Sequence, residues 1–285
     1  MYKMSQPRLP FVSTDFRGYP NVKFLAPDKL CLLSGKRFLY KYLNEESFKA
    51  TLENGFRFVE PSTWEDRFER RFYSANYDSI NPAFPQKLFA ACFTSRKNNE
   101  AAWKTYLYNP QSKDPDLSKA LCFRLTINRK LLKDALKLFS QYTFYEGPIV
   151  YLNGYNISQM HKPNMPGAKS LYNAFFGKPN FGFDDFLSLL LIKRDFFQYE
   201  EEVRYFAVPR EDECLGPIYV MPLEGVMSIV EKVFVARPYG KFKLSDTELN
   251  QLAENLKIDR AKLESFDLYS EDEEQITINK ISHEL

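Results

Sequence analysis

Short apolar runs alternate along the chain with segments whose apolar residues recur every three or four positions. The short runs predict largely buried β-strands, because Pro, Gly, Asn or Asp residues bound most of them. The predicted strands are 36–43, 56–61, 87–95, 120–127, 147–152, 217–223 and 228–236, with one more that begins near residue 200.

The segments with helical periodicity carry recognisable end signals. Asn44 and Asn128 are expected N-caps, Gly55 is expected to end the first helix, and Ser245 with Glu248 forms a capping box. The predicted helices are 45–54, 99–107, 129–139, 184–196 and 246–256.

Strands and helices mix without a regular βαβ alternation, which predicts one α+β domain. We place this domain at 37–265, after an irregular lead-in at 1–36 and before an acidic tail at 266–285. A segment rich in Gly and Pro, 153–182, predicts a long loop, and loops of that length are usually functional or mobile.

Composition supports a folded domain and describes its charge. Apolar residues make up 44% of the 285 residues and aromatic residues 16%, enough for a substantial core. Residues 1–150 hold 24 Lys and Arg against 15 Asp and Glu, a net charge of +9, whereas the remainder carries −7. The basic half could attract the phosphates of a nucleotide or a nucleic acid, or the two halves could pack against each other.

The scarcity of histidine excludes several classes of enzyme. The chain has two histidines, His161 and His283, and four cysteines with no Cys-x-x-Cys spacing. Ser-His-Asp and Cys-His catalysis, histidine-rich metal centres and four-ligand zinc sites are therefore not expected. We expect no metal, and carboxylates, hydroxyls, Lys and Arg would have to carry any catalysis. No apolar run is long enough for a signal peptide or a membrane span, so we expect a cytoplasmic protein without membrane contact.

The sequence FQYEEEVRYF, residues 197–206, places three glutamates at the start of a strand. Alternation along the strand puts Glu200, Glu202 and Arg204 on one face and predicts that Val203 and Tyr205 are buried on the other. One interpretation is a charged edge strand that faces solvent. The other is that one of these carboxylates performs chemistry, since aromatic residues flank the run and Lys193 and Arg194 precede it.

Four other residues are weaker candidates. Asp66 could be a ligand or a helix N-cap. Trp103 and Tyr106, three positions apart, could stack on a ligand or pack in the core. Lys41, within an apolar strand, either reaches an edge or faces a polar cleft.

Several short motifs resemble a widespread bacterial family known as a domain of unknown function. They are LYKY (39–42), FRFVEPSTWEDRFE (56–69), CFTS (92–95), Trp-x-x-Tyr (103–106), GPIVYL (147–152) and the run from Lys193 through E-x-E-x-R. Phe197 stands where that family usually has tryptophan.

The order of these parts also resembles the NAD-dependent ADP-ribosyltransferase superfamily: a strand with a basic residue, a helix, a second strand, and a late Q/E-x-E glutamate. This resemblance implies mixed or antiparallel β-sheets packed together with flanking helices. Both Gln198-Tyr199-Glu200 and Glu200-Glu201-Glu202 fit the Q/E-x-E motif, so the resemblance leaves open which glutamate is catalytic. We prefer Glu202, which lies deeper in the strand, as the residue that stabilises a ribosyl cation, with Glu200 orienting the acceptor. Lys41 stands where the superfamily has Arg or His.

The remaining roles that the resemblance implies concern the NAD site. Lys41 and Tyr42 would line the NAD cleft, Trp103 and Tyr106 would support or stack on the nucleotide, and Arg204 would hold the carboxylates. The activity would be a glycosyltransferase reaction that transfers ADP-ribose to a protein or nucleic-acid acceptor, as in a toxin or phage-defence effector with an antitoxin or regulatory partner.

Two other functions remain open from the residues. One is a Mg²⁺-dependent nuclease with Asp66, Glu200 and Glu202 as ligands. The other is a non-catalytic module that binds nucleic acid or protein through the basic half.

Overall fold

The structure is a computed structural model, and the description below rests on part of the chain. The residues described are 12–13, 22–25, 33, 35–67, 69–70, 73, 87–105, 120–152, 183–210, 218–220, 223–237 and 243–266. The predicted loop 153–182 and nearly all of the acidic tail lie outside these ranges.

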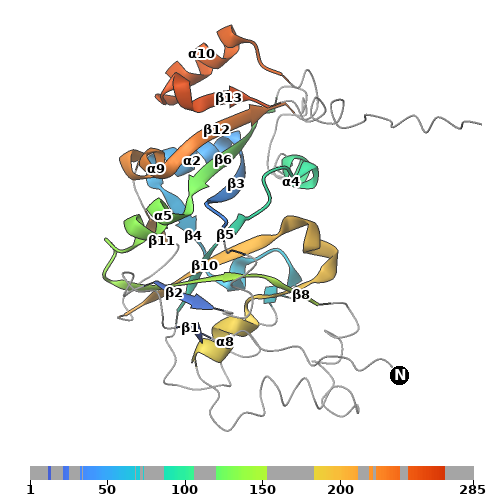
Figure 1. Ribbon diagram of the computed structural model, residues 1–285, viewed down its shortest axis with the longest axis vertical. Helices are drawn as coiled ribbons and strands as arrows, with labels where there is room; N and C mark the ends of the chain where they lie inside the picture. Colours follow the sequence, from blue (N-terminus) through green and yellow to red (C-terminus); the bar gives the residue numbers. More distant parts are fainter. Residues whose placement is uncertain are drawn as a thin grey trace, which may run out of the picture.

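The described elements form an α+β fold around one large sheet (Figure 1). The strands are β1 (Val12–Ser13), β2 (Val22–Leu25), β3 (Phe38–Asn44), β4 (Phe56–Phe58), β5 (Phe89–Thr94), β6 (Cys122–Asn128), β7 (Tyr142–Pro148), β8 (Val150–Leu152), β9 (Ile192–Arg194), β10 (Glu202–Pro209), β11 (Ile218–Val220), β12 (Val230–Ala236) and β13 (Leu263–Ser265). The α-helices are α2 (Glu45–Asn54), α4 (Glu100–Thr105), α5 (Arg129–Leu136), α8 (Phe183–Leu189), α9 (Leu223–Ile229) and α10 (Asp246–Leu256). Short 3-10 helices are η2 (Pro61–Thr63), η3 (Asp195–Glu200) and η4 (Arg260–Lys262).

The large sheet has the strand order β1-β2-β7-β10-β5-β3-β6-β12-β13. Its pairs are antiparallel except β2 with β7 and β12 with β13. Two small sheets pair β4 with β11 and β8 with β9. The sheet is therefore mixed and mostly antiparallel, as the α+β prediction requires.

The two halves of the large sheet meet at a single described residue pair. β5 and β10 pair along six positions and β3 and β6 along seven, whereas β3 pairs with β5 only at Tyr40 and Thr94. Beyond that pair β3 and β5 are not joined by ladder hydrogen bonds, so side chains can enter the gap between them.

The main hydrophobic core lies on one face of the sheet, beneath α2, α5, α9 and α10. Phe48 of α2 stacks on Phe123 of β6 with ring centroids 4.2 Å apart. On the opposite face, α8 covers the half that contains β7 and β10, and α4 covers the half that contains β3 and β6. Figure 1 shows α8 and α4 well apart from each other.

Most predicted elements are present, and the predicted caps are confirmed. Asn44 and Asn128 accept from backbone N–H groups of the helices that follow them, and Ser245 with Glu248 forms the capping box. Gly55 follows α2 with φ of +91°, a backbone conformation that side chains with a Cβ rarely adopt.

Several predicted boundaries are wrong because tertiary pairing overrides local pattern. The helix predicted at 184–196 is α8 followed by β9 and η3, since Ile192 pairs with Val150 of β8. The strand predicted at 147–152 is the end of β7 followed by β8, and the strand at 228–236 begins inside α9. The lead-in expected to be irregular contributes β1 and β2 to the large sheet.

Candidate functional site

A cavity of about 840 Å³ opens where the two halves of the sheet meet. This volume is within the range of about 300–1,000 Å³ that is usual for small-molecule sites. Its charged lining residues are Lys41, Glu65, Asp66, Arg67, Glu69, Lys193, Arg194, Glu200, Glu202 and Arg204. Its other lining residues are Tyr40, Tyr42, Asn44, Trp64, Cys92, Phe93, Thr94, Asn99, Ala102, Phe197 and Tyr199.

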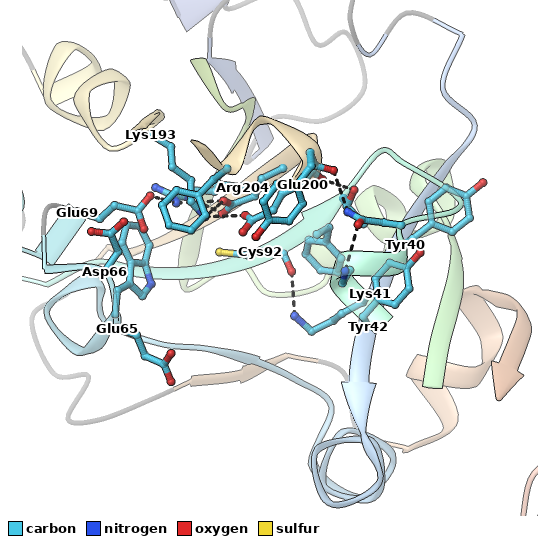
Figure 2. A pocket seen from close by; sticks show the side chains of 18 of the residues that line it. Tyr40, Lys41, Tyr42, Glu65, Asp66, Glu69, Cys92, Lys193, Glu200 and Arg204 are labelled. Carbon is cyan, nitrogen blue, oxygen red and sulfur yellow. Dashed lines mark hydrogen bonds and ion pairs between the residues drawn. The ribbon is translucent and has the colours of Figure 1, made fainter. Parts of the chain in front are cut away.

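The register of the strands brings Glu202 close to the part of β3 that contains Lys41. Tyr40 pairs with Thr94, and Thr94 pairs with Glu202. Three strands from distant parts of the sequence therefore present neighbouring residues in one row, and all three residues line the cavity. Figure 2 shows Lys41, Cys92 and Arg204 among the other side chains that line it.

Glu202 lies at the first position of β10 and is 5% exposed. Its Oε1 accepts from Arg204 Nε at 2.6 Å, and its Oε2 accepts from Lys193 Nζ at 2.9 Å and Arg204 Nη2 at 3.2 Å. Burial alone would raise the pKa of this carboxyl, but Arg204 and Lys193 hold it well below its usual range. Glu202 is therefore an anion at any physiological pH.

The interpretation of this stretch as a solvent-facing edge strand is wrong. β10 lies between β7 and β5, and its residues from Glu202 to Val208 are all buried. Charged residues at such a position need partners, because an unpaired buried charge is very costly. The cations of the cavity supply them.

Glu200 does not share a strand face with Glu202 and Arg204, as parity predicted. It ends η3, and Glu201 follows in a left-handed conformation with φ of +42° before β10 begins. Glu200 nevertheless reaches the cavity, where its Oε2 accepts from Lys193 Nζ at 2.6 Å. Burial raises the pKa of this carboxyl, with Lys193 acting in the opposite direction.

Arg204 joins the two carboxylates that lie deepest in the cavity. It is 1% exposed, and besides Glu202 it donates to Glu69 and, at 2.5 Å, to the carbonyl of Leu190. Its guanidinium lies over the ring of Trp64, 4.2 Å from the centroid. Arg204 is thus placed to hold the Glu69 and Glu202 carboxylates, as the predicted role requires.

Lys41 and Tyr42 also line the cavity. The Lys41 ammonium reaches into the gap between β3 and β5 and donates to the carbonyl of Cys92 at 2.9 Å. The Tyr42 hydroxyl donates to the carbonyl of Lys97 at 2.8 Å, and burial raises the pKa of Tyr42 to about 12. Lys41 therefore faces a polar cleft and does not extend to an edge of the sheet.

Trp103 is not among the cavity-lining residues. It is fully buried, edge-on to Tyr42 at 5.1 Å and stacked on Phe266 at 5.1 Å between centroids. Trp103 therefore supports the cavity wall from behind and is not placed to stack on a ligand. Tyr106 lies outside the described residues.

Asp66 lines the cavity and pairs with Arg194 at 2.8 Å. Within the described residues, no group of three or more His, Cys, Asp or Glu side chains is placed to hold a metal ion. The three proposed magnesium ligands, Asp66, Glu200 and Glu202, are each paired with a cation instead.

Sequence reasoning missed Glu69, Trp64 and Cys92 as parts of the site. Glu69 follows Asp66 by three positions, a spacing that places two residues on one side of a helical turn, and this signal could have identified it. Trp64 and Cys92 carry no such signal. The pairing of β5 with β10 places Cys92 opposite Arg204, and Trp64 reaches the site by packing its ring against the Arg204 guanidinium.

None of the described helices is long and apolar enough to cross a membrane. Comparison with protein-family models, curated proteins and solved structures finds no match to this chain.

Proposed function

We propose that the protein is an ADP-ribosyltransferase-like enzyme that cleaves NAD and transfers ADP-ribose to a protein or nucleic-acid acceptor. The observation that carries the proposal is the position of Glu202, a buried anion that lines a cavity large enough for a nucleotide. The order of strand, helix, second strand and late glutamate implied by the resemblance corresponds to β3, α2, β4 and β10. β3 and β10 both border β5 in the large sheet, which supports the finer fold assignment as part of the proposal.

The reaction requires a fixed negative charge. Breaking the bond between nicotinamide and ribose develops positive charge on the sugar, as in the cleavage of a glycoside. A carboxylate has about four acceptor positions, and Lys193 and Arg204 use three of those of Glu202 while the Cys92 thiol is a further donor. A ribose hydroxyl would take the place of this weak thiol donor, and the two cations prevent Glu202 from taking up a proton.

The environments of the two glutamates separate their roles. The pKa of Glu202 is lowered and that of Glu200 is raised. Such a difference is typical of catalytic carboxylate pairs in which one residue stabilises charge and the other transfers a proton. The Glu200 side chain is 26% exposed, so it can meet an acceptor at the mouth of the cavity. We therefore assign ribosyl-cation stabilisation to Glu202 and activation of the acceptor nucleophile to Glu200.

The rest of the lining fits the other parts of NAD. Arg67 is exposed where it lines the cavity, and a guanidinium suits a pyrophosphate. The rings of Tyr40, Phe197 and Tyr199 offer surfaces for a base or a nicotinamide ring.

The test is NAD cleavage by the wild-type chain and by Glu202→Gln, with NAD labelled in the adenylate part and a cell lysate as the source of acceptors. Glu202→Gln should remain folded, because neither cation loses its last carboxylate partner. Lys193 is still paired with Glu200, and Arg204 is still paired with Glu69. We expect cleavage to fall about 10²- to 10³-fold, the usual effect of removing one group that stabilises transition-state charge. Glu264→Gln, which removes an exposed partner of Lys232, is the matched control and should cleave as wild type. The proposal fails if the wild-type chain releases no nicotinamide and labels no acceptor, or if Glu202→Gln retains full activity.

A further inference from the structure

The cavity contains two lysines whose surroundings are opposite in character. Lys193 contacts two carboxylates, Glu200 at 2.6 Å and Glu202 at 2.9 Å. Lys41 has no carboxylate within ion-pair distance among the described residues. Its ammonium contacts a backbone carbonyl and lies 5.0 Å from the centroid of the Phe93 ring.

This difference decides which amine can lose its proton. Burial lowers the pKa of Lys41, and the opposing influence of Cys92 on β5 and Glu202 on β10 does not offset it. Glu202 is itself neutralised by Arg204 and Lys193, which weakens its effect on Lys41. The carboxylates around Lys193, in contrast, raise its pKa well above the usual range despite burial.

We propose that Lys41 is a nucleophilic amine that forms an imine with the aldehyde of a phosphorylated sugar bound in the cavity. Lys41 is desolvated, has no carboxylate counter-ion among the described residues and lines an accessible cavity. These are the surroundings in which lysines form imines with carbonyl substrates. The ligand class follows from the lining: the exposed guanidinium of Arg67 for a phosphate, and carboxylates that accept from sugar hydroxyls.

The step is balanced without a co-reactant. The lone pair of Nζ attacks the aldehyde carbon of the open-chain sugar, the C–N bond forms, and the carbonyl oxygen becomes a hydroxyl. That hydroxyl leaves as water, and the amine gives up both of its hydrogens in the overall reaction. The proposal goes beyond NAD cleavage and does not depend on it, although free ADP-ribose carries the same masked aldehyde and would be retained in this way.

The experiment uses the full chain with ribose 5-phosphate and cyanoborohydride, which reduces the imine to a stable amine, followed by peptide mass spectrometry. Lys193 is the internal control for access, since it lines the same cavity, and Lys49 is the control for an exposed amine, since its side chain is 52% exposed. The free-amine fraction rises about tenfold for each pKa unit lost. We expect Lys41 to be modified well before Lys49 near neutral pH, with saturation by ribose 5-phosphate, and Lys193 to remain unmodified.

Three results would overturn the proposal: modification of Lys41 no faster than that of Lys49, modification of Lys193 as readily as Lys41, or labelling of Lys41 that does not saturate with ribose 5-phosphate. Lys41→Arg should abolish the rapidly formed adduct with ribose 5-phosphate. If this variant does not fold, the rates of modification of Lys41, Lys49 and Lys193 in the wild-type chain still test the proposal. NAD cleavage is measured separately, so fast labelling of Lys41 without NAD cleavage would support this inference and refute the proposed function.

Discussion

Replacing Arg204 with methionine tests the organisation of the cavity most directly. Arg204→Met removes a buried guanidinium and keeps much of its apolar volume. Glu202 retains Lys193 as a partner. Glu69 has no other cation within ion-pair distance among the described residues, so it becomes a buried carboxylate with no counter-ion.

The expected loss of stability is about 3–5 kcal/mol at neutral pH, the usual cost of removing one partner of a buried ion pair. The loss should also depend on pH. Burial already raises the pKa of Glu69, and removal of Arg204, which lowers it, must raise it further. A group whose folded pKa exceeds its unfolded value contributes stability at low pH that is lost as the pH rises through the folded pKa. The deficit of the variant should therefore shrink on acidification, when Glu69 takes up a proton.

Urea unfolding of the wild-type chain and of Arg204→Met at about pH 5 and about pH 8 measures this, with unfolding free energies compared at each pH. Arg37→Met is the matched control, because Arg37 pairs with Glu231 through side chains that are 70% and 36% exposed. That control should lose no more than about 1 kcal/mol at either pH. A loss from Arg204→Met below about 1 kcal/mol, or one that is equal at both pH values, would show that Glu69 does not depend on Arg204.

Two further predictions concern parts of the fold away from the cavity. Glu146→Gln removes the fully buried carboxylate that Arg129 and Lys133 share, and it should cost about 3–5 kcal/mol in urea unfolding while leaving the slope with urea unchanged. Ser245→Ala removes the capping box with Glu248 and should cost about 1 kcal/mol by the same measurement. A loss below about 1 kcal/mol for Glu146→Gln, or no loss for Ser245→Ala, would contradict these assignments.

The elements that the sequence predicts well are those whose signals are local. Asn44, Asn128 and Ser245 act within a few residues of themselves, and the caps they form do not depend on distant parts of the chain. The segment 184–196 has helical composition throughout, but Ile192 is used in a parallel pair with β8. No pattern within the segment specifies that pair, so the helix was predicted too long.

The same distinction applies to the site. Lys41 and Glu202 were identifiable because a charge within an apolar strand is unusual wherever it occurs. Glu200 was placed wrongly, since alternation cannot reveal that the left-handed residue Glu201 interrupts the strand. For Trp103 the sequence allows both stacking on a ligand and packing in the core, and only the packing of Phe266 and Tyr42 around it identifies the second.

The balance of charge in the cavity narrows the ligands that it can accept. Five Lys or Arg and five Asp or Glu side chains line it, and the most buried of them are paired with one another. A ligand with several phosphates and no cationic group would meet the Glu69, Glu200 and Glu202 carboxylates as well as the cations, and like charges at short range are unfavourable, whereas a single phosphate can lie at Arg67 away from them. A ligand that carries both signs avoids this conflict, with a cationic group near Glu202 and an anionic group near Arg67. NAD has this distribution, a positively charged nicotinamide ring and a pyrophosphate. The arrangement of paired charges, more than the presence of any single glutamate, is thus the reason to test NAD before other nucleotides.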